Sequence, residues 1–222
     1  MTEPYRVITF DCYGTLVDWQ TGIFEAFRAE AARDGVALER SAVLSSYAEV
    51  EPAVQGETFR PYREVLQRTA VEVGRRVGWM IDLDRARFLP ESLPDWPVFP
   101  DTNPALQRMR DAGRTLGILS NVDDDLIAGT CRHLDVEFAF IVTAQQVRSY
   151  KPRPAHFAAV AARTAGHSWL HVAQSLYHDV VPAHDRGLPV LWVDRGGEAT
   201  AEETRPVAVV RDLAAAASWL LD

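Results

Sequence analysis

The sequence has few cysteines, fewer positive than negative charges, and no long apolar run. The two cysteines, Cys12 and Cys131, have neither the number nor the spacing of a disulfide framework or a metal site. No uncharged apolar stretch approaches the roughly 20 residues of a membrane span, and the N-terminus lacks a signal-peptide pattern. With 23 basic against 31 acidic residues, the net charge of −8 disfavours nucleic-acid or anionic-membrane partners. We therefore expect a soluble, cytoplasmic protein.

The clearest sign of a functional site lies near the N-terminus. The β-branched and aromatic run Val7 to Phe10 predicts a short buried strand, which ends at Asp11. Gly14 then marks a tight turn. Open α/β sheets bind ligands at the carboxyl ends of their strands, so Asp11 is a candidate site residue. A turn-capping role for Asp11 is the alternative at this point.

The chain divides into a helical part and an alternating part. Helical spacing predicts helices over residues 19–34, 41–54, 62–77 and 82–89, and three prolines in 93–100 end the pattern. Predicted helices over 102–112, 123–133, 154–165, 182–186 and the C-terminal residues then alternate with strands over 115–119, 140–143, 170–173, 189–193 and 207–210. Alternation indicates an α/β fold with a doubly wound, Rossmann-like parallel sheet. We predict a discontinuous core, residues 1–18 and 93–222, with an inserted helical cap subdomain, residues 19–92; the acidic stretch around Glu198, Glu202 and Glu203 reads as a surface loop.

Polar residues also follow three of the later predicted strands. Ser120 and Asn121 come directly after one, Lys151 soon after the next, and Ser175 and Asp179 after a third. Each has a plain structural interpretation, such as a helix cap or a surface charge. Because parallel strands end at one edge of the sheet, their combination favours a shared site with Asp11.

These motifs, in this order and spacing, resemble the haloacid dehalogenase (HAD) superfamily of hydrolases. The motifs are Asp11-Cys12-Tyr13-Gly14-Thr15, Ser120-Asn121, Lys151-Pro152 and Asp179. The resemblance implies that Asp11 is a nucleophile that forms a covalent intermediate. It also implies that Lys151 keeps Asp11 ionised and that Asp179 orients Lys151 and the hydrolytic water. Thr15 and Ser120 would hydrogen-bond the nucleophile or the substrate, and Tyr13, Asn121 and Ser175 would also bind the substrate.

Two departures from the phosphatases of this superfamily favour a site without metal. Those enzymes carry a second Asp where this chain has Tyr13, and they commonly have Gly-Asp-Ser where it has Ala173-Gln174-Ser175. Mg²⁺ prefers carboxylate and water ligands, so we expect no cofactor. Tyrosine at position 13 instead resembles the (S)-2-haloacid dehalogenase type II branch, in which the aspartate attacks C2 of a small carboxylic acid.

The chain also departs from those dehalogenases. They usually carry Tyr where it has Phe157, and Ser-Ser-Asn where it has Gln174-Ser175-Leu176. The stretches 11–19, 96–102, 149–152 and 175–179 resemble the subgroup that contains the azetidine-2-carboxylate hydrolase, in which a ring nitrogen is displaced. We therefore predict a metal-independent hydrolase that displaces halide or a ring nitrogen from C2. The alternatives are a Mg²⁺-dependent phosphatase of small phosphate esters and a binding protein without turnover.

Further residues are weighed for the substrate pocket. Trp19, Tyr47 and Trp96 are candidates for an apolar wall, although packing is the more usual role of aromatic residues in a cap. Arg60 or Arg63 is a candidate for a grip on a substrate carboxylate. His178 could protonate a leaving group, but a helix-end histidine is the preferred interpretation. Cys12 should point away from Asp11 into the core. Relatives of this kind are often dimers, so a homodimer is one arrangement considered.

Overall fold

The computed structural model describes residues 5–164, 166–197 and 204–222. The surface loop expected around Glu198, Glu202 and Glu203 lies outside these residues. Within them, one sheet of six strands has the order β3-β2-β1-β4-β5-β6, and each neighbouring pair is parallel. The strands are β1 Val7–Phe10, β2 Thr115–Ser120, β3 Phe140–Thr143, β4 Trp169–Ala173, β5 Val190–Val193 and β6 Ala208–Val210. The predicted doubly wound parallel α/β fold is confirmed.

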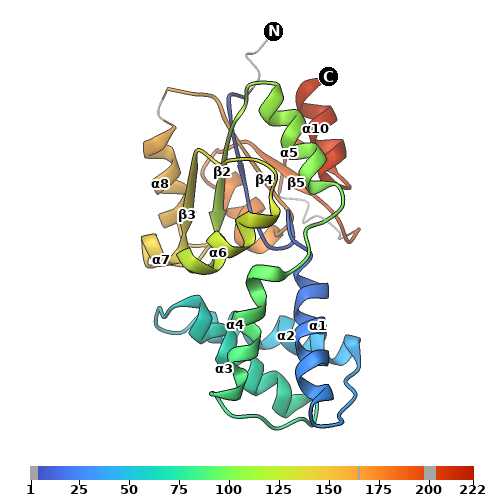
Figure 1. Cartoon of the computed structure of the whole chain (residues 1–222). Coiled ribbons are helices and arrows are strands. Elements are labelled where there is room, and N and C mark those ends of the chain that lie inside the picture. The colour runs from blue at the N-terminus through green and yellow to red at the C-terminus, as the bar shows by residue number, and fades with distance from the viewer. Residues whose placement is uncertain (1–4, 165, 198–203) are drawn as a thin grey trace.

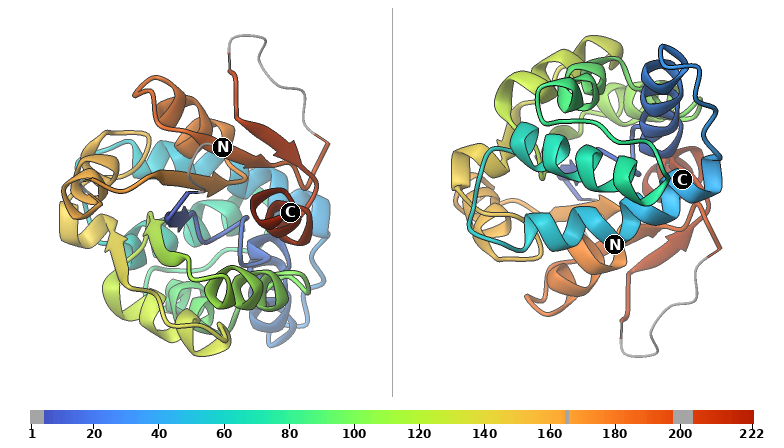
Figure 2. Two further views of the ribbon diagram at one scale, coloured as in Figure 1. Left: turned by 90° about the horizontal axis from the view of Figure 1, so that it is seen from above. Right: turned by 90° about the horizontal axis from the view of Figure 1, so that it is seen from below.

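Helices cover both faces of this sheet (Figures 1 and 2). Ile8 and Phe10 of β1 face an apolar layer with α5 (Thr102–Asp111), α6 (Asp124–Thr130) and α10 (Leu213–Leu221). A second apolar cluster, which includes Phe157 and Ala183, packs α8 (Ala155–Arg163) and α9 (Val181–His184) on the other face. Successive strand side chains alternate between these faces. Thr9 and His171 are therefore on the α8 side, where they contact one another.

The first part of the segment between β1 and β2 folds into helices that lie together below the sheet in Figure 1. These are α1 (Trp19–Ala32), α2 (Arg40–Gln55), α3 (Tyr62–Arg76) and α4 (Phe88–Ser92). The helix expected over 82–89 is wrong in its bounds. Asp82 accepts from the backbone N–H of Arg85 and forms a turn, a 3₁₀ turn covers Arg85–Arg87, and α4 follows. The division into a core and a cap of residues 19–92 stays a prediction.

Some short elements escaped sequence reasoning because they are too short to show periodicity. Among them are a 3₁₀ helix over Leu93–Asp95, α7 (Ala144–Val147) and a π-helical turn over Leu176–Val180. A side chain caps the N-terminus of α7 and of the π-helical turn. Thr143 accepts a hydrogen bond from the N–H of Gln146, and Ser175 accepts one from the N–H of His178. The π-helical turn matters most, because it carries Asp179.

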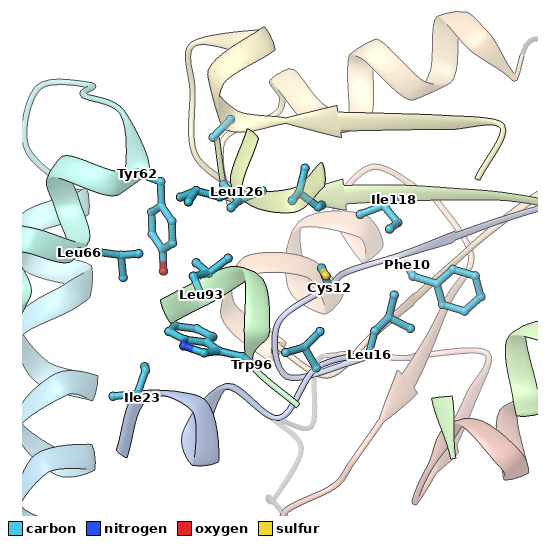
Figure 3. Packing of buried hydrophobic residues seen from close by; sticks show 14 of the residues in the cluster. Phe10, Cys12, Leu16, Ile23, Tyr62, Leu66, Leu93, Trp96, Ile118 and Leu126 are labelled. Atoms are coloured by element: carbon cyan, nitrogen blue, oxygen red, sulfur yellow. The ribbon is translucent and has the colours of Figure 1, made fainter. Parts of the chain in front are cut away.

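Hydrogen bonds and apolar packing join the helical segment to the sheet. The buried carboxylate of Asp123 accepts from the backbone N–H groups of Tyr62, at 2.8 Å, and Arg63, at 2.9 Å, at the start of α3. Figure 3 shows Tyr62, Leu93 and Trp96 in one apolar cluster with core residues such as Leu126 and Cys12. Cys12 is fully buried there, as expected. The helical segment is thereby held over the carboxyl edge of the sheet. No helix in the described ranges combines the length and hydropathy that crossing a membrane requires.

Candidate active site

Three charged side chains from separate strand ends meet at the carboxyl edge of the sheet. Nζ of Lys151 lies 2.9 Å from Oδ1 of Asp11 and 2.7 Å from Oδ1 of Asp179. It also donates to the carbonyl oxygen of Leu119 at 3.0 Å. An ammonium has three N–H groups, so these contacts use all of its donors. Lys151 and Asp179 are buried, whereas Asp11 keeps 7% of its surface exposed.

The mutual interactions of this set outweigh the cost of burial. Burial alone would lower the pKa of Lys151, but Asp11 and Asp179 hold the pKa above its ordinary value. Burial alone would raise the pKa of Asp179, but Lys151 and His171 hold it well below the usual range. Lys151 is therefore a cation and Asp179 an anion at neutral pH, which is the arrangement that buried charges need.

Neighbouring polar groups fix the nucleophile candidate and the lysine. Oγ1 of Thr15 donates to Oδ2 of Asp11 at 2.9 Å and accepts from the backbone N–H of Gln174 at 3.0 Å. The Asn121 amide accepts from the N–H of Lys151 at 2.7 Å and donates to its carbonyl oxygen at 3.1 Å. Both ends of the Asn121 amide are engaged. Asn121 therefore positions Lys151, where sequence reasoning assigned it to substrate.

A buried hydrogen-bonded chain behind Asp179 was missed by sequence reasoning. Nε2 of His171 lies 2.9 Å from Oδ1 of Asp179, and Nδ1 lies 2.9 Å from Oγ1 of Thr9, which accepts from the indole N–H of Trp169 at 2.7 Å. Since that indole can only donate, one consistent arrangement has Thr9 donating to Nδ1 and Nε2–H donating to Asp179. Phe157 packs edge-on against His171, with ring centroids 5.5 Å apart. Asp179 therefore has a histidine as a hydrogen-bond partner, although residue 157 is Phe and not Tyr.

Asp11 and Lys151 open into a cavity of about 230 Å³ between the sheet edge and the helical segment. That volume suits a molecule of a few heavy atoms. The walls are mainly aromatic or apolar on the helical side and polar on the sheet side; they comprise Asp11, Tyr13, Trp19, Ile23, Tyr47, Ala48, Glu51, Pro52, Gln55, Tyr62, Trp96, Ser120, Asn121, Lys151 and His178. Trp19, Tyr47 and Trp96, which the sequence offered as candidates for such a wall, line this cavity.

The remaining predicted substrate residues differ in their access to the cavity. Oγ of Ser120 lines it, is buried, and has no hydrogen-bond partner within the described part of the chain. Tyr13 contributes its ring, because its hydroxyl lies 3.0 Å from Oγ1 of Thr130. Ser175 does not line this cavity; its hydroxyl instead bonds the N–H and Nδ1 of His178, at 3.1 and 3.2 Å. Ser175 therefore caps the π-helical turn, and its assignment to the substrate stays a prediction.

Two interpretations of basic residues also change. His178, taken as a helix-end histidine, lines the cavity, and its buried Nε2 finds no partner among the described residues. Burial lowers its pKa, so the ring is neutral near pH 7. Arg60 and Arg63 lie outside the cavity lining: Arg60 pairs with Glu57, and Arg63 pairs with Asp125. The arginine grip on a substrate carboxylate is not supported.

Glu51 is the other site residue that sequence reasoning missed. It lies in the last turns of α2, is 7% exposed, and lines the cavity with Asp11. Nε2 of Gln55 donates to its Oε1 at 2.9 Å. Burial raises the pKa of Glu51 from 4.5 to about 7, and a hydrogen bond from Tyr62 lowers it in part. Its signal in the sequence was its place four residues after Tyr47, on the buried stripe of the helix.

The donors around Asp11 do not fit the magnesium ion that many enzymes of this superfamily use. Magnesium sites are built from hard oxygen ligands, mainly carboxylates and water. Here Tyr13 replaces the second acid, and Oδ1 of Asp179 is already bound by Lys151 and His171. In the ranges that the structure describes, no group of three or more His, Cys, Asp or Glu side chains could hold a metal ion.

Known proteins resemble the chain in both sequence and fold. (S)-2-haloacid dehalogenase H-109 of Pseudomonas putida is 28% identical over 227 residues, covering 99% of this chain and 100% of that protein. A defluorinating L-2-haloacid dehalogenase superimposes with a TM-score of 0.83 at 22% identity, covering 98% and 96% of the two chains. A HAD hydrolase of Bacillus subtilis bound to magnesium gives 0.83 at 18% identity, covering 99% and 100%. A family model described as haloacid dehalogenase-like hydrolase matches residues 5–207, and the chain belongs to that family of hydrolases.

Proposed function

We propose that the protein is a metal-independent hydrolase that uses Asp11 to displace a leaving group from C2 of a small carboxylic acid. A carboxylate oxygen of Asp11 forms a bond to C2 while the bond from C2 to the leaving group breaks, and the leaving group keeps the electron pair. The product of this step is an ester between Asp11 and the substrate carbon. Lys151 and Thr15 orient the carboxylate for this attack through their contacts of 2.9 Å each.

Water then hydrolyses the ester. It attacks the carbonyl carbon of Asp11, the acyl carbon–oxygen bond breaks, and a 2-hydroxy acid leaves as Asp11 is regenerated. Over the cycle, a halo acid and water give the 2-hydroxy acid, halide and one proton. When a ring nitrogen is displaced, it stays attached to the 2-hydroxy acid product and takes up that proton as an amine. Oδ2 of Asp179 is buried and unpartnered within the described residues, so we assign it to hold the attacking water.

The observation that carries this proposal is the Asp11–Lys151–Asp179 set opening into a small cavity beside Tyr13. One lysine balances two carboxylates only in part, and its ammonium fills the space next to Asp11. A displacement at carbon does not build up the negative charge of a transferring phosphoryl group. The reaction at C2 therefore needs no divalent cation, and the site suits it. The names of the relatives, 2-haloacid dehalogenases, support a 2-substituted carboxylic acid as substrate.

The test measures product release in EDTA from short 2-halo acids and azetidine-2-carboxylate, and from phosphate esters with and without Mg²⁺. An Asp11→Asn protein serves as the blank. We expect halide or ring-opened acid in EDTA from the unaltered protein alone. Phosphate release that depends on Mg²⁺, without turnover in the first set, would establish the phosphatase alternative.

A labelling experiment identifies the nucleophile. With excess enzyme in H₂¹⁸O, a single turnover should give unlabelled 2-hydroxy acid, because its new oxygen comes from Asp11. Label in the first-turnover product would mean that water attacks C2 directly.

The cytoplasmic location and the homodimer stay predictions.

A further inference from the structure

We propose that Glu51 selects a substrate that carries a protonated amine, so that the preferred substrate is a small amino-acid-like zwitterion. This inference rests on the proposed function and names its substrate class. Three independent features of the cavity support it: its charge, the end of α2, and its aromatic walls.

The first feature is the charge of the cavity lining. Among the described lining residues, two are carboxylic acids, Asp11 and Glu51, and one, Lys151, carries an ammonium group. All three N–H groups of Lys151 are committed to Asp11, Asp179 and Leu119. No arginine lines the cavity in the described part of the chain. A plain acid would therefore add an anion to a site already rich in negative charge, whereas a zwitterion adds no net charge.

The second feature is the C-terminal end of α2, which carries Glu51. Pro52 follows it inside the helix and has no N–H group, so the carbonyl oxygen of Ala48 lacks its ordinary helical partner. Ala48, Glu51, Pro52 and Gln55 all line the cavity. The last turn of a helix also carries partial negative charge. This part of the wall thus offers acceptors, which suit an N–H donor.

The third feature is the set of aromatic rings that line the same cavity as Glu51. Trp19 and Tyr47 lie with ring centroids 5.7 Å apart, and Tyr13 and Trp96 with centroids 5.8 Å apart. All four line the cavity. Aromatic faces attract cations, most strongly where water is excluded. A carboxylate among aromatic rings is a suitable environment for an ammonium group.

Donors lie at the sheet end of the same cavity. Ser120 has a buried hydroxyl, and His178 has a buried Nε2. Ser175 can donate to Nδ1 of His178, in which case Nε2 carries the proton and points a donor at the substrate. A zwitterion can therefore direct its carboxylate to the core and its ammonium to Glu51.

The experiment measures the binding of unreactive acids by calorimetry at pH 8. Each ligand pair exchanges an ammonium for a methyl group of similar size: 3-aminopropanoate with butanoate, 4-aminobutanoate with pentanoate, and 2-aminobutanoate with 2-methylbutanoate. The proteins are the unaltered chain, Glu51→Gln, Glu51→Asp, and Glu49→Gln as the matched control. Glu49 lies on the same helix with 72% of its side chain exposed.

We expect at least one ammonium ligand to bind about 10-fold tighter than its methyl counterpart, the effect of one charge-assisted hydrogen bond. Glu51→Gln should abolish this preference, Glu51→Asp should keep part of it, and Glu49→Gln should keep all of it. Equal binding within every pair, a preference that survives Glu51→Gln, or no binding of any ammonium ligand would overturn the inference. These ligands have no leaving group, so failure here is distinct from failure of the displacement reaction.

Discussion

Replacing Glu51 by Gln should stabilise the free protein at neutral and higher pH but not at low pH. The folded protein raises the pKa of this carboxyl from 4.5 to about 7 through burial. Between these values the folded state binds a proton that the unfolded state has released, so the free energy of unfolding falls as pH rises. The difference between the two pKa values corresponds to about 3 kcal/mol of unfolding free energy, which the protein loses as the pH rises above 7. The neutral amide of the Glu51→Gln variant has no such penalty.

The assay is chemical denaturation of the unaltered protein and Glu51→Gln at pH 5, 6, 7 and 8. The stability difference should grow by about 2.5 kcal/mol in favour of the variant across this range, or about 5–10 °C in melting temperature. His156, whose pKa burial lowers to about 4, and His178 titrate in both proteins, so their contributions cancel. A difference that does not change with pH would refute the argument that Glu51 is held in a site that disfavours its charge.

Four further substitutions test how the site is held. Lys151→Met leaves two buried carboxylates without their cation and should destabilise the fold by about 3–5 kcal/mol, measured by denaturant unfolding. His171→Phe removes a hydrogen bond to a buried carboxylate and should lower the unfolding free energy by about 1.5–3 kcal/mol; Thr9→Val, which removes a neutral partner of His171, should have a smaller effect. Gly22→Ala would place a Cβ 2.2 Å from Cγ of Trp96. It should therefore destabilise the protein by about 1–3 kcal/mol and narrow the cavity, which unfolding and substrate KM would both report.

The sheet and the convergence of Asp11, Lys151 and Asp179 could be predicted because each depends on local pattern and parallel topology. Short apolar runs gave the strands, and each polar residue followed directly after its strand. The composition held a further signal: Lys151 is the only lysine among 23 basic residues. A chain that uses arginine elsewhere has a specific need for a compact ammonium at this point, since arginine's planar fork does not fit between two carboxylates in the same way.

The role of His171 could not be predicted in this way. It lies inside β4, where a side chain normally packs, and its partners Thr9 and Asp179 are 162 and 8 residues away in the sequence. By resemblance to the dehalogenases, Phe157 in place of Tyr indicated the loss of a hydrogen-bonding group. His171 of β4 gives Asp179 a hydrogen-bond partner that a position-by-position comparison cannot reveal.

Glu51 shows why the core of this site is easier to predict than its specificity. Asp11, Lys151 and Asp179 follow strands of one parallel sheet, and the topology of that sheet allows few arrangements of their side chains. The helical segment presents side chains on several helices, and whether a helical Glu is solvated or buried depends on neighbours such as Tyr62, which comes from α3. Its position on the buried stripe with Val43, Tyr47 and Val50 was visible, but burial of a carboxylate is costly unless something compensates it. A substrate ammonium would provide that compensation, so the residue that destabilises the empty protein is the one expected to choose its substrate.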